Sequence, residues 1–123
     1  MKKKFLAVLL TAAMAVSMLA GCGSKVASDG KVLNVYCWND EFQRRVQDHY
    51  PDYVKVDEVT GKIGDVTVKW NITPNADNAY QNNLDDALNK QESAAADDKI
   101  DIFLVEADYA LKYVDSDYAA PVE

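Results

Sequence analysis

Two short polar segments of the sequence combine aromatic rings with carboxylate and amide groups. In chain order their residues are Trp38, Asn39, Asp40 and Glu41, followed by Glu106, Asp108 and Tyr109. An aromatic face stacks on the apolar C–H face of a sugar ring, while carboxylate and amide oxygens accept hydrogen bonds from its hydroxyl groups. This combination indicates binding of a polyhydroxylated small molecule.

Both segments also have a purely structural interpretation, and the two interpretations stay open here. In the first segment, Trp38 would be a core residue and its polar neighbours would be helix caps. In the second segment, Asp108 would cap a helix and Glu106 would be solvated. Asn75 and Asp77 form a weaker third candidate, because they follow a predicted central strand. In open α/β sheets, ligands bind beyond the carboxyl ends of the parallel strands, which is where all three segments are expected.

The sequence contains no pattern typical of an enzyme, a metal site or a cofactor site. It lacks the G-x-S-x-G and H-E-x-x-H motifs and a phosphate-binding glycine loop. His49 is the single histidine of the sequence, so a metal site built on a pair of histidines is not expected. Cys37 is expected to be a small buried hydrophobic residue. With 13 basic against 20 acidic residues and no basic stripe, nucleic acid is not an expected partner.

The elements that would position these residues begin at residue 31. Residues 31–38 are too densely apolar for an exposed alternating strand, so they predict a strand buried on both faces. A helix follows, for which Asn39 or Asp40 offers a capping oxygen and which Pro51 ends. The pattern is therefore strand, short loop and helix.

The next segment predicts strands rather than a helix. Residues 53–60 and 65–73 alternate in polarity, and the segment from Gly61 to Gly64 supplies the positive φ angles that a turn requires. This predicts a β-hairpin or a long bulged strand.

The last third of the chain returns to alternating helix and strand. Asn75 is expected to cap an amphipathic helix over residues 76–91, followed by an apolar strand at 100–105 and a helix start at 109–114. The repeated order of strand and helix predicts an α/β fold with parallel crossover units and helices covering the sheet.

The first residues have the layout of an export signal. Lys2 to Lys4 precede an uncharged apolar stretch at residues 5–20, which is too short for a transmembrane helix of about 20 residues with anchoring flanks. It ends in Leu19-Ala20-Gly21-Cys22, which resembles the lipobox of bacterial lipoproteins at four of four positions. The resemblance implies a signal peptide over residues 1–21 and attachment of diacylglycerol, with palmitate-type acyl chains, to Cys22.

A lipidated Cys22 would hold the protein to the cell membrane on its extracytoplasmic face. Two or three acyl chains are sufficient for stable attachment, so no transmembrane helix is needed. Residues 22–30 are then the lipidated cysteine and a flexible tether, because they are small and polar, and residues 31–123 are the folded part.

Four segments carry a wider resemblance that covers nearly all of the chain after Cys22. They are LNVYCWNDEFQRR (33–45), GKIGDVTVKW (61–70), ITPNADNAYQNNLDDAL (72–88) and DKIDIFLVEADYALKYV (98–114). Together they resemble the amino-terminal part of the extracellular solute-binding proteins of carbohydrate ABC importers, of the family 1 type. The resemblance implies a partial first lobe of a two-lobed, type II periplasmic-binding-protein-like fold. It also implies capture of a sugar or oligosaccharide and delivery to the transmembrane permease subunits.

The length of the chain departs from that family, whose members are several times longer. The resemblance therefore predicts a truncated chain with half of its ligand cleft. Two alternatives stay open. The first is a complete small envelope lipoprotein with a structural or interaction role, which a cooperative melting transition would favour. The second is a surface hydrolase whose catalytic residues lie beyond Glu123, which a catalytic motif in the downstream DNA would favour.

Overall fold

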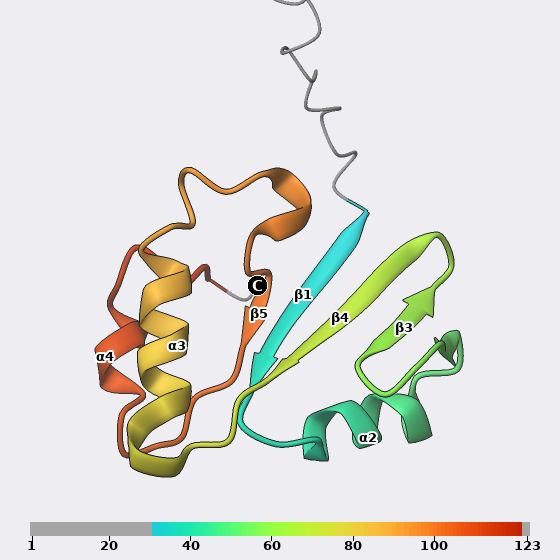
Figure 1. Cartoon of the computed structure of the whole chain (residues 1–123), viewed down its shortest axis with the longest axis horizontal. Coiled ribbons are helices and arrows are strands. Elements are labelled where there is room, and N and C mark those ends of the chain that lie inside the picture. Colours follow the sequence, from blue (N-terminus) through green and yellow to red (C-terminus); the bar gives the residue numbers. More distant parts are fainter. Residues whose placement is uncertain (1–30, 122–123) are drawn as a thin grey trace, which may run out of the picture.

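A mixed five-stranded sheet forms the centre of the molecule in the computed structural model, which describes residues 31–121 (Figure 1). The strand order is β2-β3-β4-β1-β5. The strands are β1 (Val32–Cys37), β2 (Tyr53–Lys55), β3 (Thr60–Ile63), β4 (Val66–Ile72) and β5 (Ile102–Phe103). The helices are α2 (Glu41–His49), α3 (Ala79–Leu88) and α4 (Leu111–Val114), with single 3-10 turns at Ala76–Asn78 and Ala96–Asp98.

β1 is the central strand and lies where the sequence predicts it. It pairs in parallel with β4 on one side, with Val35 opposite Trp70, and in parallel with β5 on the other. Val35 and Cys37 are buried on the face that α2 covers, and Cys37 is 0% exposed. The expectation that Cys37 is a small buried hydrophobic residue is confirmed.

α2 follows β1 after three residues, also as predicted. The N-cap residue is Asp40, whose side chain makes no capping hydrogen bond, so the expected side-chain cap is not formed; Asn39 Oδ1 instead accepts from the Glu41 N–H at 3.0 Å in a turn that leads into the helix. The helix packs Phe42 against Trp70 of β4, with ring centroids 5.9 Å apart, and it ends just before Pro51. α2 therefore covers one face of the sheet.

The antiparallel side of the sheet differs from the prediction in two respects. β2 stops at Lys55, and Gly61 lies within β3 opposite Val68 rather than in a turn. The turn between β3 and β4 is at Gly64, whose φ is 60°. β3 pairs antiparallel with both β2 and β4, so only β4, β1 and β5 form the parallel part of the sheet.

α3 starts later and ends earlier than the predicted helix over residues 76–91. Asp77 and Asn78 have positive φ angles of 50° and 61°, which interrupt the helix at its start. Asn75 makes no capping hydrogen bond within the described chain, so the expectation that it caps this helix is wrong. The predicted apolar face is confirmed, because Tyr80, Leu84 and Leu88 are buried.

β5 and α4 are shorter than expected. Only Ile102–Phe103 of the predicted strand at 100–105 pairs with β1 as a strand, and α4 begins at Leu111 rather than at residue 109. The Asp101 carboxylate accepts a hydrogen bond from the Asn34 N–H at 2.8 Å. Asn34 in turn donates from its side chain to the carbonyl oxygen of Lys99 at 2.9 Å. Side-chain contacts thus hold this segment against β1 where strand pairing is short.

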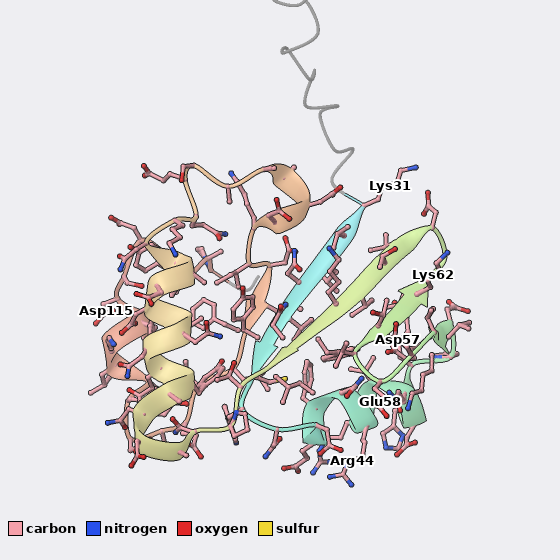
Figure 2. All side chains as sticks on the ribbon, in the orientation of Figure 1. Lys31, Arg44, Asp57, Glu58, Lys62 and Asp115 are labelled. Atoms are coloured by element: carbon pink, nitrogen blue, oxygen red, sulfur yellow. The ribbon has the colours of Figure 1, made fainter. Side chains whose placement is uncertain are left out.

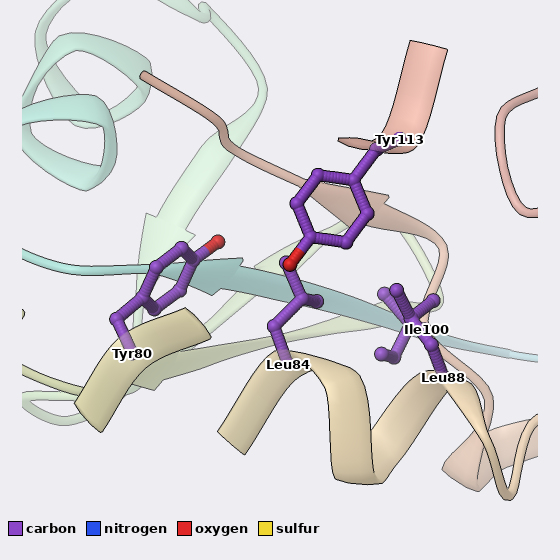
Figure 3. Close-up of a cluster of buried hydrophobic side chains, with 5 residues drawn as sticks. All are labelled: Tyr80, Leu84, Leu88, Ile100 and Tyr113. Carbon is purple, nitrogen blue, oxygen red and sulfur yellow. The ribbon is translucent and has the colours of Figure 1, made fainter. Parts of the chain in front are cut away.

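The core is divided between the two faces of the sheet. α2 packs on the face that carries Val35, Cys37, Val68 and Trp70. On the opposite face, α3 and α4 bury a second cluster (Figure 3), whose members are Tyr80, Leu84, Leu88, Ile100 and Tyr113. The molecule is therefore a small α/β domain with helices on both faces of a mixed sheet.

Candidate functional site

The carboxyl ends of the three parallel strands meet at one edge of the sheet. At this edge β1 leads into α2, β4 leads into α3, and β5 leads into the segment before α4 (Figure 1). All three predicted segments therefore lie at the same edge, which is the position that ligands take in open α/β sheets. We call it the carboxyl edge.

The first predicted segment joins the edge to the core. Trp38 is half-buried, and its ring packs edge-on against that of Tyr80, with centroids 5.7 Å apart and an interplanar angle of 70°. Asp40 and Glu41 are exposed and form ion pairs within α2, to Arg44 at 3.3 Å and Arg45 at 2.6 Å. The hydrogen bond from Arg45 lowers the pKa of Glu41. These two carboxylates have cations beside them, and Trp38 contributes to the core as well as to the edge.

The second predicted segment is brought into contact with the third. Asn75 Nδ2 donates a hydrogen bond to Glu106 Oε2 at 3.4 Å, which links the loop after β4 to the loop after β5. The Tyr109 N–H donates to the Glu106 carbonyl oxygen at 3.2 Å. Asp77 and Asp108 are exposed and make no hydrogen bond or ion pair among residues 31–121. Asn75, the weaker candidate from the sequence, thus makes a side-chain contact between two loops of the edge, whereas Asp108 does not.

Several polar atoms near this edge are buried without a hydrogen-bond partner in the described structure. They are Asn71 Nδ2, Asn75 Oδ1 and Tyr109 Oη. Buried polar groups are nearly always satisfied by protein or water, so these three atoms are candidates for a contact with water or a ligand. Burial raises the pKa of the Tyr109 hydroxyl, which therefore stays protonated at neutral pH and available as a donor.

Asn71 was not a candidate from the sequence. It is the residue before the last one of β4, on the face opposite Trp70 and Ile72, which pack toward α2. A polar residue near the carboxyl end of a strand is a weak signal, because strand residues at the solvent side are often polar. Only the tertiary structure shows that its amide is buried.

Tyr80 holds the strands together just below the edge. Its hydroxyl oxygen lies 2.6 Å from the Leu104 carbonyl oxygen and 3.0 Å from that of Tyr36, so its proton is shared between β1 and the end of β5. Burial strongly raises the pKa of this hydroxyl, which keeps it a donor. The side chain fixes the separation of two of the loops that form the carboxyl edge.

The hollows of the described residues lie beside the carboxyl edge rather than over its β4 and β5 loops. One of about 590 Å³ lies between Tyr36, the second half of α3 and the loop that contains Asp98. Glu41 lines a separate hollow on α2. Trp38, Glu106 and Tyr109 line neither of these two hollows.

The described residues provide no obvious metal centre. Within residues 31–121 no group of three His, Cys, Asp or Glu side chains is placed to hold a metal ion, and His49 is exposed at the end of α2. No helix in this range has the length and apolar character needed to cross a membrane. The predicted signal peptide, Cys22 and the tether lie outside the described residues.

Comparison of the chain with models of protein families, with curated proteins and with solved structures finds no match.

Proposed function

We propose that this protein is the lipid-anchored, extracytoplasmic substrate-binding component of an ABC importer, and that it captures a sugar or oligosaccharide for the permease subunits. One observation carries the proposal. The aromatic and polar side chains of Trp38, Asn75, Glu106 and Tyr109 come from three separate loops at the carboxyl edge of the parallel strands, where Asn75 and Glu106 are hydrogen-bonded to each other. A hydroxyl-rich ligand requires an apolar face together with several hydrogen-bonding groups, and this edge offers both.

The fold is compatible with the first lobe of a two-lobed, type II periplasmic-binding-protein-like domain, and we infer that the sheet contributes to such a lobe. Binding proteins of this architecture enclose the ligand between lobes that close around a hinge. An open carboxyl edge would then be one wall of the cleft. The inference stands on the helices on both faces of the sheet and on the open edge.

A fluorescence titration of the full chain tests the binding proposal directly. The chain has two tryptophans, of which Trp70 is buried in the core at 4% exposure and Trp38 lies at the carboxyl edge. A sugar that stacks at the edge should change the emission of Trp38 alone. We expect a saturable change with neutral mono- and disaccharides at millimolar concentration, because one open wall encloses the ligand only in part.

Two variants make this titration decisive. Trp38→Phe should abolish the fluorescence change, whereas Tyr50→Phe, an exposed aromatic residue at the end of α2, should leave it intact. Asn75→Ala should weaken binding by about 5- to 10-fold through the loss of hydrogen bonds worth about 1 kcal/mol or somewhat more. If no sugar in a broad neutral panel changes the emission of Trp38, the binding proposal is wrong.

The importer partnership has its own test. Genes for permease transmembrane subunits next to this gene, and loss of uptake of one sugar when this gene is deleted, are the expected results. Normal uptake of every sugar transported by the neighbouring permease after deletion would contradict the partnership.

A further inference from the structure

The carboxyl edge has a strongly one-sided charge on the β4 and β5 side. The loops at residues 73–79 and 104–110 contain the carboxylates of Asp77, Glu106 and Asp108 and no lysine or arginine. All three residues are exposed. Glu106 accepts from the neutral Asn75 amide rather than from a cation. A ligand that approaches this part of the edge therefore meets negative charge.

The cations of α2 and α4 form ion pairs with other carboxylates. Arg44 and Arg45 pair with Asp40 and Glu41 along α2. Lys112 of α4 pairs with Asp85 on α3. None of these three side chains forms an ion pair with the carboxylates of the β4 and β5 loops. The loops after β4 and β5 therefore contribute no lysine or arginine of the kind that binds carboxylate or phosphate groups.

The unsatisfied groups at the edge match uncharged hydroxyl groups. Asn75 Oδ1 is an acceptor, Asn71 Nδ2 is a donor, and the Tyr109 hydroxyl can do either. A sugar hydroxyl both donates and accepts, so it can satisfy all three kinds of atom. Together with Glu106 we call these residues the Asn75 cluster.

We propose that the Asn75 cluster selects the charge of its ligand, taking neutral or amine-bearing sugars and rejecting sugar acids and sugar phosphates. The proposal rests on the sugar-binding function proposed above and specifies the substrate class at the same edge. An added carboxylate or phosphate would be repelled by Asp77, Glu106 and Asp108, and these loops contain no lysine or arginine to replace its water. An added ammonium group would instead be attracted.

The test compares sugars that differ only in charge. The probes are glucose, galactose and mannose, the corresponding uronic acids, and the corresponding 2-amino sugars, titrated into the ¹⁵N-labelled full chain in detergent micelles. The side-chain amide signals of Asn71 and Asn75 report binding and are assigned from Asn71→Ser and Asn75→Ser. We expect the best neutral sugar to bind at least about tenfold more tightly than its uronic acid, which corresponds to about 1.4 kcal/mol.

A variant with fewer charges shows whether the sugars are selected by their charge or by their shape. Glu106→Gln combined with Asp108→Asn should bring the neutral and uronic forms to within about threefold of each other. Glu92→Gln combined with Asp115→Asn removes the same charge from exposed positions beyond the C-terminal ends of α3 and α4 (Asp115 is labelled in Figure 2), away from the carboxyl edge, and should leave the ratio unchanged. Raising the salt to about 1 M, where the Debye length is about 3 Å, should also reduce the ratio in the unmodified chain.

Each result has a distinct meaning. Equal binding of a neutral sugar and its uronic acid overturns the charge selection and leaves the sugar-binding function standing. Shifts confined to Trp38, with unchanged Asn71 and Asn75 amides, overturn the role of the Asn75 cluster alone. The absence of any shift with every neutral, amino and acidic sugar overturns both proposals.

Discussion

At the scale of single residues, side-chain packing explains why a glycine, Gly61, occupies the middle of β3. A Cβ atom at this position would lie 2.1 Å from Tyr53 Oη, because the Tyr53 ring crosses directly over the Gly61 backbone. That ring is fixed in turn, since Trp70 Nε1 donates a hydrogen bond to Tyr53 Oη at 2.9 Å. The absence of a side chain at Gly61 is therefore a packing requirement.

We expect Gly61→Ala to lower the free energy of unfolding by about 1–3 kcal/mol, the usual range for overpacking. Urea unfolding followed by tryptophan fluorescence measures the change. Lys62→Ala, in the same strand and exposed, should change stability by less than about 0.5 kcal/mol. Equal effects of the two substitutions would contradict the packing role of the Tyr53 ring.

Cys37 makes the stability of the fold sensitive to alkaline pH. Burial, with the charge of Asp40 as a smaller contribution, raises the pKa of its thiol from about 9 to about 11. In the unfolded chain the thiol ionises near its ordinary pKa, so its contribution to stability is complete below pH 9. That contribution is lost as the pH rises from 9 to 11.

The difference in unfolding free energy between the unmodified chain and Cys37→Ala isolates this effect. Other groups that titrate in the same range, including the tyrosines, are present in both proteins. We expect Cys37→Ala to be less stable at pH 7, through the lost packing of the thiol, and to lose less stability than the unmodified chain between pH 9 and pH 11. Parallel stability curves over that range would show that the thiol is not shielded from ionisation.

At the scale of elements, α4 is held in place by a single carboxylate of α3. Asp85 Oδ1 accepts a hydrogen bond from the Tyr113 hydroxyl at 2.8 Å, and its Oδ2 accepts one from Lys112. Tyr113 is 3% exposed and its ring packs against Phe103, with centroids 5.5 Å apart. A four-residue helix has little stability of its own, so these contacts determine its position.

We expect Asp85→Ala to release α4 before the rest of the molecule unfolds. The substitution leaves the buried Tyr113 hydroxyl without its acceptor, which costs about 1–3 kcal/mol. Hydrogen exchange of residues 111–114 should become faster, while exchange in β1 and β4 changes little. Asp86→Ala is the matched control, because that neighbouring side chain is exposed and lines the hollow beside Tyr36.

The elements that the sequence predicts correctly are those with a strong local pattern. β1 has a dense apolar run, α2 has an apolar face and a proline stop, and α3 has Tyr80, Leu84 and Leu88 at helical spacing. The errors lie where tertiary contacts override local preference. Gly61 has the composition of a turn but pairs within β3, because it must fit beneath the Tyr53 ring.

In the candidate site, too, the features that depend on element order are predicted correctly and those that depend on tertiary contacts are not. The sequence places Trp38 and Glu106 correctly at the carboxyl edge, because the rule for strand ends in α/β sheets depends only on element order. It could not show that Asn75 contacts Glu106, a residue 31 positions away. Nor could it identify Asn71, since the burial of its amide depends on how the segments around the end of β4 pack.

At the scale of the whole molecule, the two ends of the sheet have different roles in the proposed function. Lys31 precedes β1 at the edge opposite to the carboxyl edge (Figure 2). A lipid anchor at Cys22 would join the folded part through that residue. The anchor would then be attached at one edge of the domain, and the Asn75 cluster would lie at the other, accessible to a solute from the medium.

The lipid anchor is the last prediction and the most direct one to test. In the bacterium of origin, we expect the protein to appear in the membrane fraction and in the detergent phase after Triton X-114 partition, because two or more acyl chains anchor a protein stably. Its mass should match a chain that starts at Cys22 and carries diacylglycerol. Cys22→Ala should remove the modification and prevent cleavage, so that an unlipidated precursor that keeps its signal peptide accumulates.

Counting thiols provides an independent measurement, since the chain has only two cysteines. In a lipidated protein the Cys22 sulfur is blocked and Cys37 is buried, so the native protein should react with almost no thiol reagent and the denatured protein should react at one site. A protein without lipid would react at two sites after denaturation. Two reactive thiols in the protein isolated from the bacterium would contradict the lipobox assignment, while the sugar-binding proposal would stand, because the Asn75 cluster does not depend on the anchor.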